Sequence, residues 1–503
     1  MHTRRILCAL LTCVAPFAAH AGFLDFDLPH LGEQRAFTTT NYTLVTQDAG
    51  TAKLLTDQVA SLEGLLATLL ERDARPTGKP TVIYVMRAET WHSLLDRYPG
   101  TVFLPQRFAN YILVHDHQRG ASLRKLICSE YTRLFLHEHF RAQYPLWFEE
   151  GLAGVMQGST LRSKSATFEN PDIYAANFPS QGVFSTDAEL PSLIVIPLRM
   201  LMKVDSATKA KLEEVAFDTY TKQTWSTVYR ALIADPVRRK QTLRFLEAYD
   251  AREPLESAVQ TGFGISLEQL DQVLRNPERK PRDNIRIEFP AVTAHRLKEP
   301  RLVDETEGLT ILARALLESP DDALAVDKLL DQAASLSPGS NVVKTLRLYR
   351  AAQARDDVTL LKELQALESA VKQMGVARAV GLALTERIRE TEGPPAIRER
   401  AFTLLDQALA ARPDDAEAAW AFGIVAAQLK RDLPLAEQRL RRAEELVPRS
   451  ADLEMAKAYV YAAQGQRDKT MSSLDAIARF SRQPALQSWA LTRLQAMRDG
   501  SSQ

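Results

Sequence analysis

Apolar residues recur every three or four positions over residues 52–72. This spacing predicts an amphipathic helix, because residues three and four apart lie on one helix face. Residues 37–47 alternate apolar side chains with threonines, which indicates a strand. Short apolar runs at 81–85 and 110–114 predict two more strands, and the pattern over 123–140 favours a helix. The N-terminal region therefore has an α+β pattern.

The pattern becomes helical from about 200 to 280, and residues 281–305 are charged and punctuated by prolines. We interpret 281–305 as a strand-like connector and linker. From 306 the chain is rich in Ala, Leu, Glu and Arg, and a period emerges: Pro413 and Pro448 lie 35 residues apart, each after an Ala-rich helix.

The period resembles that of tetratricopeptide repeats, which stack helix hairpins because one hairpin cannot bury its apolar face alone. Unit 416–448 places its small and large packing residues where such repeats do, and the next unit does the same. Weaker copies end at Pro338 and Pro413. The packing residues of the two clearer units are Phe422, Gly423, Ala426, Ala436, Leu440 and Ala443, then Ala458, Tyr461, Gly465, Leu474 and Ile477. The alternative is an irregular helical bundle.

Length and charge narrow the classes of protein. A chain of 503 residues predicts two to four domains, and 45% apolar with 25% charged residues is typical of a globular protein. The 63 basic and 63 acidic residues balance, so we expect no nucleic-acid partner. Three cysteines cannot build a disulfide framework.

Residues 1–21 have the pattern of a secretory signal. Arg4 and Arg5 precede a ten-residue apolar stretch that is too short to span a bilayer, and Ala19-His20-Ala21 matches a cleavage site. We expect cleavage after Ala21, a periplasmic or secreted product, and no transmembrane segment afterwards. Cleavage leaves Cys128 as the single cysteine. The alternative is an N-terminal core helix.

The stretch 121–156 contains the candidate site residues of the chain. Its second half contains Pro145, Trp147, Glu150 and Gly151 in a Pro-x-Trp-x-x-Glu-Gly-x-Ala arrangement. The layout resembles gluzincin-type zinc metallopeptidases, in particular peptidase-MA-like proteins that join such a domain to tetratricopeptide repeats. In that family, His-Glu-x-x-His on one helix and a Glu on the next hold zinc, and the first Glu is the general base.

The resemblance implies a particular architecture and site. It covers about residues 37–280 and implies an α+β, thermolysin-like domain over 22–280. A linker over 281–305 and an all-α tetratricopeptide solenoid over 306–495 would follow it, giving a mostly helical chain. Glu150 stands at the third-ligand position of the family and Glu130 at the general-base position.

The first half of the motif is broken, because it contains Ser129-Glu130-Tyr131-Thr132-Arg133. Both histidine ligand positions are lost, to Ser129 and Arg133. An arginine cannot donate a lone pair, and at about 4 Å it repels a unit charge by roughly 4 kcal/mol at an effective dielectric near 20. We therefore expect no zinc cofactor, and predict that Arg133 pairs with Glu150, and with Glu130, in the vacated position. The alternative is an Arg133 on a solvated helix face.

Three histidines are candidates for a variant metal site. His137 follows Glu130 by two helix turns, and His115 and His117 would point to one face of a strand. With Glu130 and Glu150, these residues could hold zinc under an alternative interpretation. Without a metal, they are ordinary surface, loop and helix-end residues, and Trp147 is a core or cleft-wall residue.

Three functions remain open at this point. The first is an exported, non-catalytic interaction protein that binds a protein or peptide through its repeat groove and its former peptidase cleft. The second is an active metallopeptidase that uses a variant metal site. The third is a structural scaffold subunit of an envelope assembly. The loss of both histidine ligands favours the first.

Overall fold

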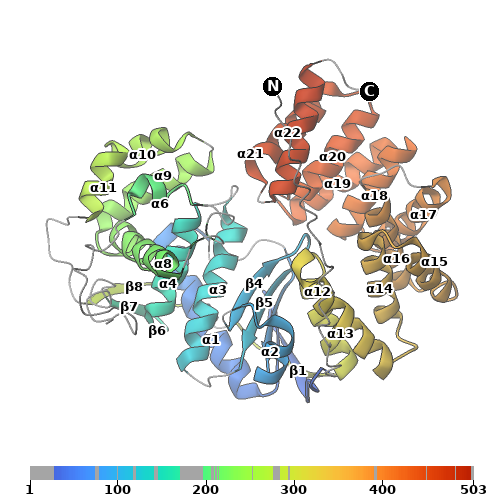
Figure 1. Cartoon of the computed structure of the whole chain (residues 1–503), viewed down its shortest axis with the longest axis horizontal. Coiled ribbons are helices and arrows are strands. Elements are labelled where there is room, and N and C mark those ends of the chain that lie inside the picture. Colours follow the sequence, from blue (N-terminus) through green and yellow to red (C-terminus); the bar gives the residue numbers. More distant parts are fainter. Residues whose placement is uncertain are drawn as a thin grey trace, which may run out of the picture.

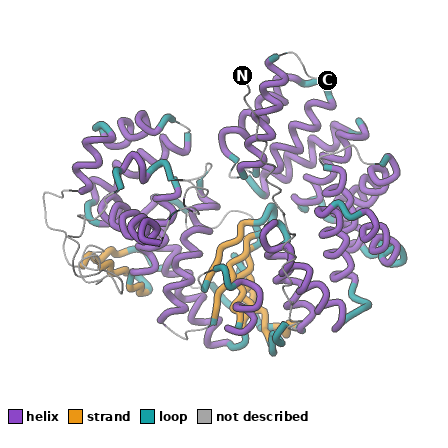
Figure 2. Tube along the Cα trace, in the orientation of Figure 1, coloured by secondary structure: helices purple, strands orange, loops and turns teal. Residues whose placement is uncertain are grey.

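The protein is mostly helical, with its strands gathered in the N-terminal part of the chain (Figure 2). The structure is a computed structural model, and the predicted signal segment 1–21 and His117 lie outside the residues that it describes. It describes residues 28–73, 79–98, 100–116, 121–140, 145–169, 196–204, 209, 212, 214–251, 253–275, 284–292, 295–389, 394–448, 450–481 and 483–499.

A six-stranded mixed sheet forms the centre of the N-terminal part, in the order β4-β5-β3-β2-β1-β9. Neighbours β2, β3 and β5 are parallel, and the remaining pairs are antiparallel. Its strands are β1 (Gln34–Thr38), β2 (Thr43–Thr46), β3 (Thr81–Met86), β4 (Thr101–Pro105), β5 (Asn110–His115) and β9 (Arg301–Val303). The strands expected at 81–85 and 110–114 are confirmed, but 37–47 is a hairpin of two strands rather than one, and β4 was not predicted.

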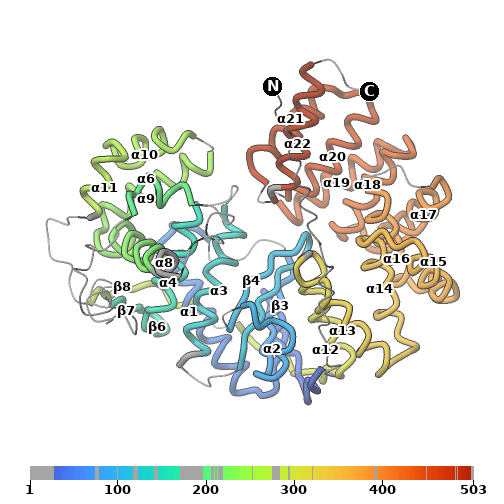
Figure 3. Tube along the Cα trace, viewed as in Figure 1, coloured from blue at the N-terminus to red at the C-terminus, as the bar shows by residue number. Residues whose placement is uncertain are grey.

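Both faces of this sheet are buried, because successive side chains point to opposite faces. Ile83 and Val85 join the core beneath α1 (Ala49–Leu70) and α3 (Ala121–His139), the two helices expected at 52–72 and 123–140. Tyr84 and Met86 join a second core beneath α2 (Ala88–Leu95), α12 (Glu305–Leu316) and α13 (Ala323–Leu336). The sheet thus lies between two helical layers (Figure 3).

Helices α12 and α13 were expected to begin a separate solenoid at 306, yet they cover the second face of the sheet. The approach is close at Gly308, where a Cβ atom would lie 2.7 Å from Leu31 Cδ1 and 3.0 Å from the Tyr84 hydroxyl. The N-terminal sheet and the helical region therefore share a core.

Residues 281–305, expected as a strand-like connector and linker, contribute strands to both sheets. β8 (Asn284–Glu288) pairs with β7 (Ser165–Glu169), which also pairs with β6 (Thr160–Arg162) in a small antiparallel sheet. β9 pairs with β1 at the edge of the large sheet. The segment is part of the N-terminal fold.

The expectation of helices between 200 and 280 is confirmed for the described residues. This group packs beside α3 and α4 and appears in green in Figure 1. Helix α4 spans Leu146–Gly158. The members of the group are α6 (Leu198–Leu201), α8 (Glu214–Val228), the π-helix η1 (Tyr229–Ile233), α9 (Pro236–Asp250), α10 (Leu255–Phe263) and α11 (Leu267–Arg275). Within the described ranges, no helix combines the length and apolar character that crossing a bilayer requires.

The C-terminal region is all-helical. The unit 416–448 forms the hairpin α18–α19, and a Cβ atom on Gly423 would lie 2.8 Å from Leu440 Cδ1, so the small residue permits the close helix contact. A short 3-10 helix, η2 (Pro320–Asp322), precedes α13. The helices after α13 are α14 (Asn341–Ala354), α15 (Asp357–Ala366), α16 (Met374–Ile388), α17 (Pro395–Ala411), α18 (Ala416–Leu429), α19 (Leu433–Leu446), α20 (Ala451–Ala463), α21 (Arg467–Phe480) and α22 (Pro484–Arg498).

Candidate functional site

Helices α3 and α4 pack side by side and bring the two halves of the broken motif together (Figure 1). Glu130 and Ser129 are buried on α3, and Glu150 on α4 is mostly buried. Arg133 follows Ser129 by four residues, which places both on one face of α3. The predicted i, i+4 placement on one helix face is therefore present, with a serine and an arginine at the two positions.

The Arg133 guanidinium links the two helices. It donates hydrogen bonds to Glu130 Oε1, to Ser129 Oγ at 2.9 Å, and to Glu150 Oε2 at 3.0 Å. The Arg133 side chain is 21% exposed. The predicted pairing with both carboxylates is confirmed, and Arg133 does not lie on a solvated face. Charge-assisted hydrogen bonds of this kind are stronger than neutral ones.

Lys209 is a further cation in this group, and the sequence did not indicate it. Its ammonium lies 2.7 Å from Glu150 Oε1, the carboxylate oxygen that Arg133 leaves open. Burial alone would raise the pKa of Glu150, but Arg133 and Lys209 outweigh it and hold that pKa below its ordinary value. Lys209 lies 59 residues after Glu150, with no motif to connect the two.

These side chains do not fit a zinc ion. Two of the three ligand positions of the resembled family hold a serine hydroxyl and a guanidinium, and Glu150 has an acceptor oxygen committed to each cation. A dication would meet two fixed positive charges at close range. Among the described residues, no group of three or more His, Cys, Asp or Glu is arranged to hold a metal ion.

Gly151, the residue after Glu150, lies where α4 and α8 cross closely. Helix α8 crosses α4 so closely that a Cβ atom on Gly151 would lie 2.4 Å from the carbonyl oxygen of Thr224. The Tyr220 hydroxyl group belongs to the same helix, and burial, with Glu150 and Glu149 nearby, raises its pKa. The adjacent Glu150 and Gly151 thus place a site carboxylate next to a close helix contact.

The opposite face of α3 is fixed by a second buried polar group. Tyr131 donates to Glu63 Oε1 on α1, and His295 Nε2 lies 2.7 Å from Glu63 Oε2. Cys128 accepts a hydrogen bond from Gln58 Nε2 at 3.1 Å, and burial raises the pKa of its thiol to about 12. This thiol stays protonated near neutral pH, so it packs as a small apolar group.

The histidine candidates lie elsewhere. His115, at the end of β5, packs against Trp91 and His92 with ring centroids 5.7 and 5.3 Å away. His137 packs against Phe103 of β4 at 5.6 Å. Neither histidine forms a metal-holding group with Glu130 and Glu150 in the described part of the chain.

Trp147 is part of the core. Its side chain is buried and lies 5.7 Å from Phe148 and 6.4 Å from Phe245, measured between ring centroids. Of the two roles expected for it, the core position is the one that the structure gives.

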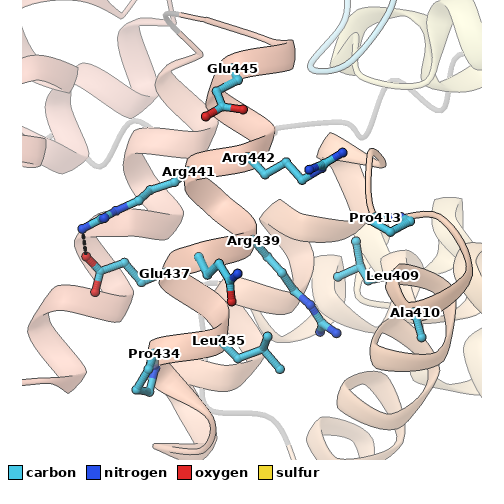
Figure 4. Close-up of a pocket in the computed structure, with 11 residues that line it drawn as sticks. Leu409, Ala410, Pro413, Pro434, Leu435, Glu437, Arg439, Arg441, Arg442 and Glu445 are labelled. Carbon is cyan, nitrogen blue, oxygen red and sulfur yellow. Dashed lines mark hydrogen bonds and ion pairs between the residues drawn. The ribbon is translucent and has the colours of Figure 1, made fainter.

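A separate cavity of about 700 Å³ lies among the C-terminal helices, between α17 and α19 (Figure 4). Leu409, Pro413 and Leu435 supply apolar walls. Its arginines are paired with acidic neighbours: Arg441 with Glu437 at 2.6 Å, Arg439 with Asp406 at 2.8 Å, and Arg442 with Asp414. This paired surface presents no candidate chemistry.

A comparison with protein-family models gives no match for this chain, and a comparison with curated proteins gives none.

Proposed function

We propose that this protein is an exported, non-catalytic interaction protein. In this proposal, a metallopeptidase-like domain has exchanged zinc binding for an internal ion-pair group, and a tetratricopeptide-type solenoid binds a protein or peptide partner. The observation that carries the proposal is the Arg133 guanidinium bound to both Glu130 and Glu150. The general-base and third-ligand positions of the resembled family are thereby tied to one arginine.

The chemistry supports loss of the metal-assisted reaction. A general base must accept a proton from water, and a zinc ion must lower the pKa of that water. Glu130 Oε1 instead accepts hydrogen bonds from Arg133 and from Ser129, whose Oγ lies 3.3 Å away. An active metallopeptidase would need Arg133 to move away from both carboxylates.

The repeat resemblance supports the interaction function. Hairpins α14–α15, α16–α17, α18–α19 and α20–α21 follow one another, and their first helices contact in series. Stacked hairpins of this kind offer an extended surface for a peptide or helix. The predicted signal segment supports export, which N-terminal sequencing of the mature protein after Ala21 would test.

The zinc content of the purified protein tests the metal part of the proposal. We expect far less than one zinc ion per chain by elemental mass spectrometry after dialysis. The double variant Ser129→His with Arg133→His restores two imidazoles beside Glu150, and we expect about one zinc ion per chain. Near-stoichiometric zinc in the unaltered protein would overturn the proposal.

A matched control distinguishes the effect of removing the Arg133 guanidinium from the effect of adding a second histidine ligand for zinc. Ser129→His with Arg133→Leu removes the same guanidinium but offers a single imidazole. Zinc binding by this control should be at least tenfold weaker than by the double-histidine variant, because zinc sites use three or four protein ligands. If both variants stay free of zinc while folded, the α3–α4 geometry is not that of a former metal site.

A further inference from the structure

The turn between β4 and β5, residues 106–109, lies against the C-terminal helices. Figure 1 shows the β4–β5 end of the sheet directed toward them. Gln106 Nε2 donates to the Ala315 carbonyl at 2.6 Å, and the Arg107 backbone N–H donates to Glu318 Oε2 at 2.9 Å. The turn is thereby fixed at the end of α12, and Arg107 and Phe108 face the later helices.

Arg107 enters a pocket formed by four successive hairpins, which we call the Arg107 pocket. Its Nε donates to Asp452 Oδ1 at 3.0 Å, and its Nη1 donates to Glu386 Oε2 at 3.1 Å. The guanidinium carbon lies 4.3 Å from the Trp420 ring centroid. The pocket residues are Glu318, Tyr349, Glu386, Trp420 and Asp452.

The pocket belongs to the inner series of helices. Tyr349, Glu386, Trp420 and Asp452 come from α14, α16, α18 and α20, the first helix of each hairpin. These helices contact one another in order, so the pocket lies on their common face. The Arg107 side chain is 8% exposed there, and Phe108 adds a ring contact to Trp420 at 5.9 Å.

The residues of this contact indicate specific recognition of an arginine side chain rather than nonspecific packing of the turn against the helices. Hairpin turns favour Gly, Asn, Asp and Ser, yet this one carries Arg107 and Phe108 at its tip. A buried ion network is weak evidence for stability compared with apolar packing, but it selects a guanidinium by its fork geometry and its stacking on an indole ring. Three carboxylates around one arginine favour a cationic occupant.

There is also room beside the pocket. A cavity of about 270 Å³ borders two of these three carboxylates, Glu318 and Glu386, and is also lined by Arg389. Arg389 lies 3.2 Å from Glu386, on the oxygen that Arg107 does not use. A segment longer than the turn could therefore extend from the pocket along the helices.

We propose that the Arg107 pocket is the partner-binding site of the repeats. It recognises a protein segment in which an arginine is followed by an aromatic residue. The protein's own β4–β5 turn occupies the pocket until such a segment displaces the turn. This rests on the proposed function, since it names the partner class of the repeats. The intact chain is then in a self-occupied state, and a partner must compete with Arg107 and Phe108.

Replacing the turn tests this in the full chain. Pro105 pairs with Asn110, so a two-residue Asn-Gly turn can replace residues 106–109 and keep the strand register. The probe is a fluorescent hexapeptide of sequence Pro-Gln-Arg-Phe-Ala-Asn. We expect the shortened-turn protein to bind it at least tenfold more tightly than the unaltered protein does, by fluorescence anisotropy.

Two controls define the chemistry. A probe with lysine in place of arginine should bind at least tenfold more weakly, because an ammonium lacks the planar fork. Asp452→Asn in the shortened-turn background should weaken binding by a similar factor with little change in shape. The pair Arg107→Gln with Phe108→Ala, which keeps the turn length, serves the same test if the shortened turn does not fold.

The shortened-turn protein and the Arg107→Gln, Phe108→Ala variant both leave the Arg107 pocket empty, and we call them the emptied proteins. Equal binding of the arginine peptide by the unaltered and the emptied proteins would overturn the proposal. So would an emptied, folded protein that binds neither probe, because the pocket would then be a fixed contact within the chain. Neither result alters the zinc measurements, so failure of this inference is distinguishable from failure of the lost-metal proposal.

Discussion

Arg133 holds carboxylates from two helices, and this single side chain decides the chemistry of the site. Glu130 lies three residues before it on α3, and Glu150 lies across the helix interface on α4. The sequence predicted both contacts, because a guanidinium is the side chain best matched to two carboxylates. Lys209 was not predictable, since only the folded chain brings it to Glu150.

Removing the guanidinium should destabilise the fold. Arg133→Leu leaves Glu130 buried without its cation, and we expect a loss of about 3 kcal/mol in the free energy of unfolding, measured by urea denaturation. Arg286→Leu is the matched control, because Arg286 is 62% exposed beside Glu288, and its loss should be below about 0.5 kcal/mol. Equal losses for the two variants would contradict a structural role for the ion pairs.

The pKa of Glu150 predicts a pH dependence. Because it is lower in the folded protein than the unfolded value of about 4.3, ionised Glu150 stabilises the fold above that pH. The stabilisation is lost as the pH falls through the folded pKa. The difference in unfolding free energy between the unaltered protein and Glu150→Gln should therefore shrink between pH 6 and pH 3. A difference that stays constant over this pH range would contradict stabilisation of the fold by ionised Glu150.

At the scale of elements, glycine decides which helices can touch. The contact of α4 with α8 depends on Gly151, and that of α18 with α19 depends on Gly423. The sequence predicted small residues at the repeat contacts from their period. It predicted most helices and the two central strands, since their apolar patterns are strong. It missed β4 and merged β1 with β2, because short strands leave few positions for a pattern.

Adding one methyl group at the α4–α8 crossing should be costly. In Gly151→Ala the new Cβ atom would lie 2.4 Å from the Thr224 carbonyl oxygen, which forces the helices apart, and we expect a loss of about 1–3 kcal/mol in the free energy of unfolding. Gly375→Ala in α16 is the control, because a Cβ atom added there would have no neighbour within 4 Å beyond the adjoining residues and the backbone of its own helix. It should be neutral or stabilise by up to about 1 kcal/mol. Thermal and urea unfolding measure both, and a neutral Gly151→Ala would refute the close approach.

At the scale of the whole molecule, the sheet and the helical region form a continuous structure. One face of the sheet is covered by α12 and α13, and the β4–β5 turn is seated on later helices. The apparent boundary at 305, drawn from a change in composition, therefore does not separate two independent cores. Composition reports local preference, whereas a core is defined by which surfaces are buried together.

Truncation tests this arrangement. A chain that ends at residue 304 exposes the apolar face that carries Tyr84, Met86 and Leu113, and we expect it to aggregate and bind a hydrophobic dye. A chain that ends at residue 340 keeps α12 and α13, and should be monomeric by sedimentation, with cooperative unfolding. A stable, monomeric 304-residue chain would show that the sheet needs no cover from the helical region.

The sequence by itself determined the local features of this protein: the main helices, the central strands, and the spacing of Ser129, Glu130, Arg133 and Glu150 along the chain. These depend on spacing over a few residues, which the chain carries directly. The tertiary structure alone decided the second cation on Glu150, the packing of His115 and His137 away from the site, the shared core of sheet and α12, and the burial of Arg107. Each of these depends on residues far apart in the chain, whose meeting is set by the whole fold.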